Sequence, residues 1–477
     1  MQNQTTNPGQ EITLEVGKKV IIKGMPPNLY LCVAQENTFI NPKYESNERQ
    51  GYSNWETSHT IETYQATDGN LIVPRGYLPR LLELCDLNDI TPKIIDQRVS
   101  CPTTFPELKG VTLRPYQQRA VGDAMTSNQG VIVSPTGSGK SLMGLEIIRR
   151  RGQKALIIVH RSDLAKQWID VIAERMGIVA GFIGEGKWMI GESVTVAMIQ
   201  TLSAQEEETR LLSDYFGLVL MDEVHHAPAE TFTDVIGWLA AKYRYGLSAT
   251  LNRRDGLEKM IYRAIGFVIA TIKKEEVEGV GATVPVSVLS INTHFNPGGV
   301  DSWHEYLDAI TESVPRNEFI LNIANRDDNS ILILTDRITH AETLSNMLTE
   351  RGVAHVLAHG KLSKKERAEV MERFETEKIT IGTTSLIGEG IDCSNWGALV
   401  MATPISSETK LMQAIGRIVR PRKGKTGARV YDLKDDCGFA GSSFKSRFEV
   451  YKKNKIWVKF ENDNGNAGDR RYAPTAH

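Results

Sequence analysis

Residues 130–150, GVIVSPTGSGKSLMGLEIIRR, decide the fold of this 477-residue chain. A short apolar run precedes a loop with two glycines, and an amphipathic segment follows the loop, which predicts a strand, a turn and a helix in that order. Glycines let backbone N–H groups turn inward on a phosphate, and the helix presents its positive end to the same charge. We therefore predict a phosphate-binding loop between this strand and this helix.

Each residue of the loop has a predicted task. Lys140 is expected to reach the β and γ phosphates of a nucleoside triphosphate, and the Ser141 hydroxyl is expected to hold magnesium. Ser134 stands where the general pattern has its first glycine, so the strict form is not met. The alternative is a structural glycine-rich turn. The predicted phosphate contacts are Thr136, Gly137, Ser138, Gly139, Lys140 and Ser141.

A second half-site follows another apolar run in residues 217–226, GLVLMDEVHH. The run delivers Asp222 and Glu223 to the carboxyl end of a strand, where open α/β sheets bind ligands. We expect Asp222 to hold the metal, and Glu223 to act as the base that orients and deprotonates water. An acidic pair after a strand is more often a solvated strand end, but the phosphate loop favours the catalytic interpretation.

Apolar runs alternate with amphipathic segments on both sides of this loop, a texture typical of parallel sheets covered on both faces. One set lies in residues 109–280 and a second set in residues 281–440, so we predict an α/β protein with two tandem parallel-sheet domains. We expect residues 1–10 to be disordered and residues 11–108 to form a small β-rich accessory domain that recognises DNA structure. Residues 441–477 are expected to form a basic-aromatic segment that ends in a frayed tail.

Within the accessory domain, ITLEVGKKVIIKG and NLYLCVAQ are expected to be strands, and DGNLIVPRG a turn that leads into another strand. LPRLLELCDL is expected to be a closing helix. Three aromatic residues, Tyr44, Tyr52 and Trp55, lie in a polar stretch. Two interpretations stay open for them: they stack on nucleic acid bases, or they cover a small β core.

Composition places the chain among ordinary globular proteins, with 24% charged and 41% hydrophobic residues. The formal charge is −2, so a polyanion would have to be held by a local basic surface. Five cysteines without a CxxC pair predict neither a disulfide framework nor a zinc site. With no secretory signal pattern and no long apolar run, we expect a soluble cytoplasmic protein that has no membrane partner.

The order of these motifs over residues 110–435 resembles the superfamily 2 helicases and translocases of the DExH type. The resemblance implies two RecA-like domains that hydrolyse ATP with Mg²⁺. LRPYQQRA is similar to the adenine-reading segment, which implies that Gln117 contacts the base and that Arg114 supports it. QAIGRIVRP resembles the block that supplies arginine fingers, which implies that Gln413, Arg417 and Arg420 face the γ-phosphate.

Further blocks resemble segments that touch the nucleic acid backbone or link it to ATP: VHRSDLAKQW, IQTLS, SAT and TTSLIGEGIDC. The resemblance places Gly390 and Asp392 near the nucleotide. Nucleic acid contacts are implied for Arg161, Gln200, Thr201, Thr383 and Thr384.

The arginines of the finger block have a physical argument of their own. Phosphoryl transfer leaves negative charge on the equatorial oxygens, and a cation from a separate domain accelerates it by roughly 10³ to 10⁵. Arg417 and Arg420 lie three residues apart, so we expect them to share one face of a helix. The alternative is a solvated basic face; between the two arginines, we favour Arg420 as the finger.

Residues 246–262, GLSATLNRRDGLEKMIY, resemble the XPB type of helicase and phage branch-migrating helicases such as UvsW. Those proteins carry an Arg-Glu-Asp triplet where this chain has Arg253, Arg254 and Asp255. The change leaves any role of the central acid in doubt. A basic contact to DNA by Arg253 and Arg254 and a solvated loop stay open as alternatives.

The polymer along which the protein is predicted to move, its track, is DNA. Residues 417–459 supply 13 Lys and Arg against 4 Asp and Glu to bind it. Phe444, Phe448 and Tyr451 recur at helical spacing, which favours packing over base stacking. We therefore predict an ATP-dependent DNA helicase or translocase that remodels branched or duplex DNA. Two alternatives are an RNA-directed motor of the same fold, for which RNA is the less favoured partner, and a non-translocating ATP-gated clamp.

Overall fold

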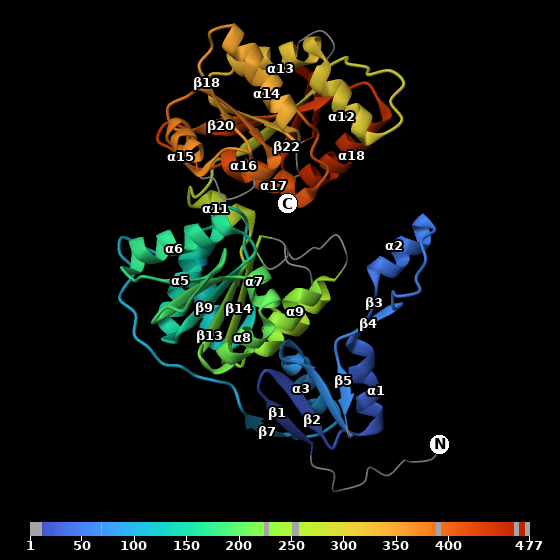
Figure 1. The fold of residues 1–477 in the computed structure, drawn as a ribbon, viewed down its shortest axis with the longest axis vertical. Coiled ribbons are helices and arrows are strands. Elements are labelled where there is room, and N and C mark those ends of the chain that lie inside the picture. The colour runs from blue at the N-terminus through green and yellow to red at the C-terminus, as the bar shows by residue number, and fades with distance from the viewer. Residues whose placement is uncertain are drawn as a thin grey trace. The chain divides into compact units, whose positions relative to one another are not determined.

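The computed structural model describes residues 12–67, 69–223, 229–249, 257–387, 393–461 and 467–472. The chain divides into two compact units, Met1–Lys274 and Glu275–His477 (Figure 1). Each unit contains an eight-stranded sheet with helices packed on it, and the first unit also contains a five-stranded sheet and a two-stranded sheet. The α/β class with two tandem parallel-sheet domains is thus confirmed.

The large sheet of the first unit has the order β11-β10-β12-β9-β13-β14-β8-β15. Its described strands pair in parallel except for β11, which is antiparallel to β10. The central strands are buried on both faces because their apolar runs are nearly continuous. The strands are β8 (Gln129–Val133), β9 (Ala155–Val159), β10 (Gly181–Gly184), β11 (Lys187–Met189), β12 (Val194–Met198), β13 (Leu218–Asp222), β14 (Tyr243–Ser248) and β15 (Val268–Thr271).

Helices connect these strands. Two glycines set the ends of the helix that follows the phosphate loop. It begins after Gly139 and ends before Gly152, and both glycines are left-handed, with φ of 81° and 57°. The other helices are α4 (Pro115–Thr126), α6 (Ser162–Met176), α7 (Ile199–Ala204), α8 (Glu206–Leu211), α9 (Ala229–Trp238) and α10 (Glu258–Ile265), with η2 (Leu212–Asp214); the loop helix is α5 (Lys140–Arg151).

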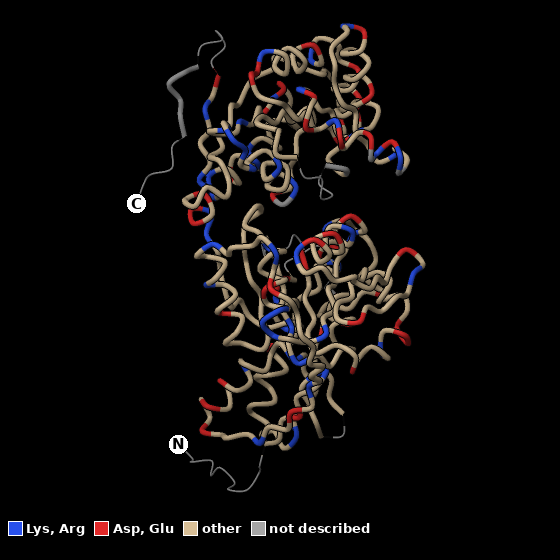
Figure 2. The backbone as a smooth tube through the Cα atoms, turned by 90° about the vertical axis from the view of Figure 1, so that its left-hand side faces the viewer, with Lys and Arg blue, Asp and Glu red and all other residues tan. Residues whose placement is uncertain are grey.

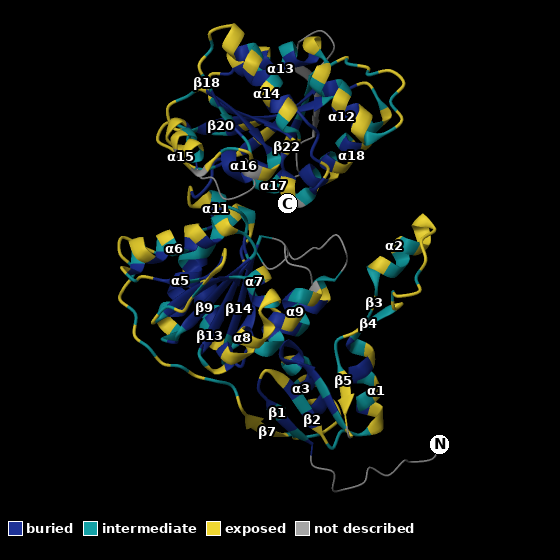
Figure 3. Ribbon diagram, in the orientation of Figure 1, coloured by how far each residue is buried: buried dark blue, intermediate teal, exposed yellow. Residues whose placement is uncertain are grey.

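The second unit repeats this plan with the sheet order β18-β19-β17-β20-β21-β16-β22-β23. Its strands are mostly buried under helices (Figure 3). The strands are β16 (Val286–Asn292), β17 (Ser330–Thr335), β18 (His355–Ala358), β19 (Ile379–Thr383), β20 (Trp396–Met401), β21 (Ala428–Lys434), β22 (Trp457–Glu461) and β23 (Ala467–Tyr472). The helices are α11 (Lys274–Gly279), α12 (Trp303–Glu312), α13 (Val314–Arg326), α14 (Ile338–Glu350), α15 (Lys364–Arg373), α16 (Thr384–Ile387), α17 (Glu408–Ile418) and α18 (Gly438–Lys453).

Residues 457–461 and 467–472 are part of this second sheet, whereas we expected a separate segment with a frayed tail. Strand β22 pairs in parallel with β16, and β23 pairs with β22. Helix α18 is held by a buried ion pair in which Arg447 Nη2 lies 2.7 Å from Asp432 Oδ1, and the Tyr451 hydroxyl donates to the same carboxylate at 2.8 Å. The expected packing of Phe444, Phe448 and Tyr451 is confirmed. Tyr451 belongs to the core cluster, Phe448 packs against it, and the Phe444 ring lies 6.0 Å from the Phe448 ring.

The accessory domain contains more helix than we expected. Its sheet has the order β5-β6-β2-β1-β7, with a second pair β3-β4. NLYLCVAQ, expected to be a strand, forms helix α1, because Pro27 starts a helix well and Leu29 and Val33 then share the buried face. The elements are β1 (Thr13–Val16), β2 (Lys19–Lys23), α1 (Pro27–Glu36), β3 (Thr38–Ile40), α2 (Pro42–Gln50), β4 (Thr60–Glu62), β5 (Gln65–Thr67), β6 (Asn70–Pro74), η1 (Arg75–Tyr77), α3 (Leu78–Asp86) and β7 (Lys93–Asp96).

The accessory domain packs against the first large sheet through two buried arginines. Arg75 donates to the Ala241 carbonyl at 2.6 Å and to the Gln129 side-chain oxygen at 3.0 Å. Arg244 donates to the Lys18 carbonyl at 3.0 Å. Burial lowers the pKa of both guanidinium groups, to about 9 for Arg244. The two parts of the first unit are therefore joined through the start of β14.

Charged residues of both signs are interspersed along the chain in both units (Figure 2). This distribution agrees with the formal charge of −2.

No helix among the described residues combines the length and the apolar character that a bilayer crossing requires.

Candidate active site

The phosphate loop lies at the carboxyl end of β8 and is held by the neighbouring elements. The Ser134 N–H donates to the Ser248 carbonyl at 2.8 Å, which joins the start of the loop to the end of β14. Gly137 and Gly139 adopt φ of 84° and 81°, a region in which residues with a Cβ are strained. The Ser134 and Ser138 hydroxyls are hydrogen-bonded to each other. The shape of the loop is therefore supported by hydrogen bonds within the protein and by the two glycines.

Gln117, the predicted adenine contact, lies directly beside this loop. Its amide nitrogen donates to the Ser138 carbonyl at 2.8 Å, and its amide oxygen accepts from the Arg114 N–H at 2.8 Å. A Cβ on Gly139 would lie only 2.4 Å from that amide nitrogen, so the glycine is needed for this approach. The fold thus brings Arg114 and Gln117 to the loop, and their contact with adenine stays a prediction.

Lys140 and Glu223 meet across the carboxyl ends of β8 and β13. The Lys140 Nζ lies 3.0 Å from Glu223 Oε1, and both side chains are mostly buried. Glu223 has φ of 52°, an uncommon left-handed conformation for a residue with a side chain. The phosphate-binding lysine and the predicted base therefore form an ion pair, and a bound phosphate would compete with Glu223 for Lys140.

Asp222 is the last residue of β13 and is 8% exposed. Burial raises the pKa of its carboxyl to about 6, and the neighbouring Glu223 charge adds to the shift. The Asp222 Oδ2 accepts a hydrogen bond from the Trp168 indole at 2.9 Å, whereas Oδ1 is buried without a hydrogen-bond partner. A buried carboxylate oxygen without a donor fits a cation ligand, because a cation would relieve its desolvation.

Trp168 is a residue that the sequence analysis did not assign to the site. It lies on α6 with Ala165 and Ile172 on the same buried face, and that spacing alone indicates a core position. Gly144 on α5 makes room for it, because a Cβ there would lie 2.8 Å from the indole ring. The bond to Asp222 joins residues that are 54 positions apart, so local sequence carries no signal for it.

Three residues predicted to contact nucleic acid gather at the carboxyl ends of β9 and β12. Arg161 precedes α6, and Gln200 and Thr201 lie in α7. The Gln200 amide donates to the His160 carbonyl at 2.8 Å, which brings the two segments together. Their contact with nucleic acid stays a prediction.

Two threonines of the second unit that were predicted to contact nucleic acid already have partners. Thr383 is 1% exposed, and its hydroxyl lies 3.2 Å from that of Ser385. Thr384 donates to the Asp336 carboxylate. A phosphate contact by Thr383 would therefore require exposure of this residue.

The two predicted finger arginines do not share a helix. Arg417 lies in the last turn of α17, which ends at Ile418, so Arg420 is already outside it. The prediction of a common helical face is therefore wrong. The reason is local, because Pro421 disfavours the helical conformation of the residue before it. Gln413 and Arg417 lie on α17, and the γ-phosphate contacts of all three residues stay predictions.

Four predicted site residues lie outside the described residues. They are Arg253, Arg254, Gly390 and Asp392.

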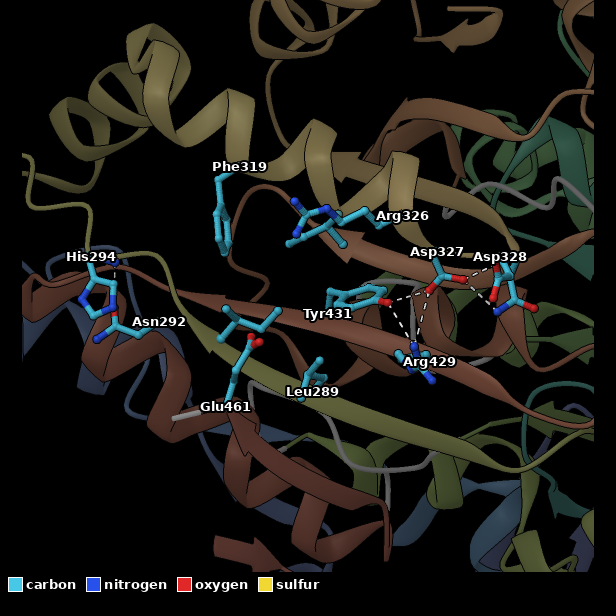
Figure 4. Close-up of a pocket in the computed structure, with 13 residues that line it drawn as sticks. Leu289, Asn292, His294, Phe319, Arg326, Asp327, Asp328, Arg429, Tyr431 and Glu461 are labelled. Atoms are coloured by element: carbon cyan, nitrogen blue, oxygen red, sulfur yellow. Dashed lines mark hydrogen bonds and ion pairs between the residues drawn. The ribbon is translucent and has the colours of Figure 1, made fainter. Parts of the chain in front are cut away.

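A cavity of about 460 Å³ lies within the second unit, between α13 and strands β16, β21 and β22 (Figure 4). Its charged groups interact with each other: Asp327 accepts a hydrogen bond from the Tyr431 hydroxyl at 2.6 Å and lies 3.8 Å from Arg429. Among the residues that the structure describes, none of those predicted to bind nucleotide or nucleic acid lines this cavity. We therefore do not include it in the candidate active site.

Comparison with protein families agrees with the paired half-sites. Residues 110–253 match the family described as "Type III restriction enzyme, res subunit", and residues 315–422 match "Helicase conserved C-terminal domain". These two regions together span more than half of the chain and contain the phosphate loop, the acidic pair and the arginine block. The chain belongs to the superfamily 2 helicases.

This helicase is similar to several curated proteins. "Probable helicase D10" of Escherichia phage T5 is 28% identical over 380 residues, covering 78% of this chain and 82% of the relative. "DNA 3'-5' translocase XPB2" of Sulfurisphaera tokodaii is 25% identical over 373 residues, covering 69% and 83%. "ATP-dependent DNA helicase uvsW" of Enterobacteria phage T4 is 23% identical over 438 residues, covering 83% and 84%. The resemblance to XPB-type and UvsW-type helicases is thus confirmed.

A solved structure agrees with the fold of this helicase. The structure of S. cerevisiae Dbp5 bound to RNA and ADP BeF3 matches with a TM-score of 0.55 at 18% identity, covering 74% of this chain and 90% of Dbp5. At this identity the match supports the fold, with two RecA-like domains, and nothing finer. With its family and fold established, the helicase is an enzyme that depends on ATP hydrolysis.

Proposed function

We propose that this helicase moves on DNA and remodels branched or duplex DNA. The names of two similar proteins, the XPB2 translocase and the uvsW helicase, specify DNA. The observation that carries the catalytic part is the cluster of Lys140, Glu223 and Asp222, in which one buried Asp222 oxygen has no donor. This cluster has the groups that phosphoryl transfer to water requires: a cation that binds the phosphate, a base and a metal ligand.

The nucleotide would change the partner of Lys140. Binding of a triphosphate gives Lys140 a stronger partner than Glu223, which releases this carboxylate to orient and deprotonate the attacking water. Ser141, at the start of α5, and Asp222 would hold Mg²⁺. The ion would neutralise charge that develops on the phosphate oxygens.

The second unit would contribute the arginine fingers. We infer that Arg417 and Arg420 reach the γ-phosphate when ATP is bound, with Gln413 beside them, and that Gly390 and Asp392 lie near the nucleotide. ATP would then favour a closed state only through contacts that the open state lacks, and hydrolysis would remove those contacts. Alternate closing and opening on one strand would produce movement along it.

The track would be held through its backbone. We place Arg161, Gln200 and Thr201 of the first unit on the phosphates, because they gather at one sheet edge. Thr383 and Thr384, together with Arg253 and Arg254, complete the proposed set. Backbone contacts of this kind carry no base sequence information, so this motor would be tolerant of sequence.

Two substitutions test the catalytic assignment. Lys140→Ala should abolish ATP turnover, because the phosphate cation is lost. Glu223→Gln should bind ATP but hydrolyse it about 10² to 10⁴ times more slowly, because the base is lost. The matched control is Lys166→Ala, which removes an exposed lysine on α6 of the same unit. Normal turnover in the Lys140 variant, or loss of ATP binding in the Glu223 variant, would contradict these roles.

The polymer is tested by ATPase and strand-displacement assays on single-stranded, duplex, forked and four-way DNA beside matching RNA. Stimulation by forked or four-way DNA above that by RNA is expected. Greater stimulation by RNA would favour the RNA-directed alternative, for which one similar protein is named "Putative ATP-dependent RNA helicase L396". ATP-dependent binding without any strand displacement would favour a clamp.

A further inference from the structure

An arm without a core projects from the accessory domain. It comprises residues 38–62: strand β3, helix α2, a loop of residues 51–59 and strand β4. In Figure 1 the arm stands away from the sheet of the accessory domain. Not one residue of the arm is buried, as the colours of Figure 3 show for α2, β3 and β4. The arm therefore contributes little to the hydrophobic core, so its role is not explained by stabilisation of the fold.

Two aromatic side chains are exposed in the loop of this arm. Trp55 is 93% exposed and Tyr52 is 65% exposed. For Tyr52 and Trp55, the alternative of covering a small β core is therefore excluded; Tyr44 is half-buried and packs on His59. Trp side chains are highly buried on average, so a Trp ring that is 93% exposed is available to a partner.

The arm is shaped by polar contacts that hold its loop in one conformation. The Asn47 amide donates to the Asn54 side-chain oxygen at 2.9 Å, and the Asn54 amide donates to the Tyr44 carbonyl at 3.1 Å. Asn41 spans the stem by donating to the Ser58 carbonyl at 2.8 Å. Trp55 thus follows Asn54, whose side-chain amide is hydrogen-bonded through both its oxygen and its nitrogen. The exposure of Trp55 follows from this loop geometry.

The charge of the arm opposes a grip on the phosphate backbone. Its loop, residues 51–59, contains a single Lys, Arg, Asp or Glu, the acid Glu56. Along the whole arm, two bases, Lys43 and Arg49, face four acids, Glu45, Glu48, Glu56 and Glu62. Intact duplex presents phosphates outward, so this arm would be repelled by it, whereas unpaired bases present flat faces that stack on aromatic rings without a cation.

These observations also favour bases over a protein partner. Protein interfaces bury about 800 Å² on each side around an apolar centre. On the arm, the large hydrophobic side chains that are exposed are Ile40, Tyr52 and Trp55, and Ile40 belongs to the stem. A single ring with polar surroundings is small for such a centre but is the size of one nucleobase.

We propose that the arm of residues 38–62 binds DNA junctions by stacking Trp55, supported by Tyr52, on a base that is unpaired. This inference rests on the proposed function, since it takes DNA as the polymer. The arm would direct the motor to places where bases are exposed, and its acids would disfavour continuous duplex.

The test compares two DNAs in the absence of nucleotide. One is a fork with 2-aminopurine at the first unpaired position, and the other is a relaxed, covalently closed circular duplex, which has no ends or unpaired bases. Trp55→Ala should bind the fork about 5 to 100 times more weakly than the wild type, with no change on the circle. Quenching of 2-aminopurine, expected with the wild type, should be lost in this variant.

Trp55→Phe should recover most of the fork binding, because phenylalanine retains a stacking face. Leu31→Ala is the matched control, since Leu31 is also exposed, at 68%, but lies on α1 outside the arm. Thermal melting of the Trp55 variants should equal that of the wild type, since the side chain packs against little. Wild-type fork binding by Trp55→Ala would overturn the proposal and point to a protein partner; equal loss on fork and circle would also overturn it.

The Lys140→Ala variant separates this proposal from the proposed function. It lacks the phosphate lysine but keeps the arm, so it should still quench 2-aminopurine in the fork. If the wild type quenches the fork but shows no DNA-stimulated ATP turnover, the motor assignment fails and the arm assignment stands. DNA-stimulated turnover without quenching gives the reverse result.

Discussion

Gly76 is the position at which one added methyl group should push the accessory domain away from helix α10. It lies in η1, and a Cβ built there would be 2.3 Å from the Tyr262 carbonyl oxygen and 2.5 Å from the Arg263 carbonyl oxygen. Both obstacles are backbone atoms of α10, which cannot rotate away as a side chain could. Ordinary contact requires about 3.4 Å, so Gly76→Ala forces a displacement of about 1 Å between the two parts.

Overpacking of this kind costs about 1–3 kcal/mol, and we expect the upper part of that range because the displaced atoms are backbone. The shift would also loosen the neighbouring Arg75, whose buried guanidinium depends on the Ala241 carbonyl at 2.6 Å. Urea unfolding should therefore show that the free energy of unfolding of the first unit falls by about 2–3 kcal/mol. Limited proteolysis should cut faster in residues 97–113, which connect the accessory domain to α4.

Gly122→Ala is the matched control, since it makes the same substitution within α4 where nothing lies within 4 Å of the added Cβ. Alanine in a helix interior should stabilise the protein by about 0.5–1 kcal/mol. The two variants should therefore shift stability in opposite directions. Equal stability of Gly76→Ala and the wild type, or shifts of the same sign in both variants, would refute the docking that we describe.

Three further predictions concern the chemistry and the second unit. Trp168→Phe removes the indole N–H that donates to Asp222, and a hydrogen bond to a charged group is worth about 1.5–3 kcal/mol. Steady-state assays should therefore show ATP turnover reduced roughly tenfold or more. Unchanged turnover at limiting magnesium would contradict this expectation. Burial lowers the pKa of His340 from 6.5 to about 3. Between these pH values the unfolded state binds more protons than the folded state, so the free energy of unfolding falls as the pH is lowered, by about 2 kcal/mol from pH 7.5 to 5. Urea unfolding of His340→Gln should not show this decrease. Arg420→Ala should lower turnover about 10³-fold or more without weakening nucleotide-free DNA binding; the reverse result in binding and ATPase assays would make Arg420 a track residue.

Sequence patterns predicted the class of fold because their signals are local. Runs of apolar residues separated by amphipathic segments indicated parallel sheets, and the glycine loop marked where the first strand ends. The sequence also carries a signal for the end of α17 before Arg420, because Pro421 disfavours the helical conformation of the residue before it. The prediction of a common helical face did not use this signal. In the same way, Pro27 marked α1 where we expected a strand.

The C-terminal segment shows a different limit. Its basic and aromatic composition resembles that of an accessory tail, yet Arg447 and Asp432 form an ion pair buried in the second unit. Composition cannot distinguish a solvated arginine from one that neutralises a carboxylate inside a domain, because the difference lies in the partner. The pairing of β22 with β16, more than 160 positions away in sequence, carries no local pattern either.

By itself the sequence determined the two-sheet architecture, the phosphate loop and the acidic pair, because each depends on residues close together in the chain and on their intrinsic geometry. Only the tertiary structure decided that Trp168 donates to Asp222, that Arg75 and Gly76 dock the accessory domain, and that Trp55 stays exposed. Burial and hydrogen-bond partners are set by segments far apart in the chain, so these properties exist only once the chain has folded.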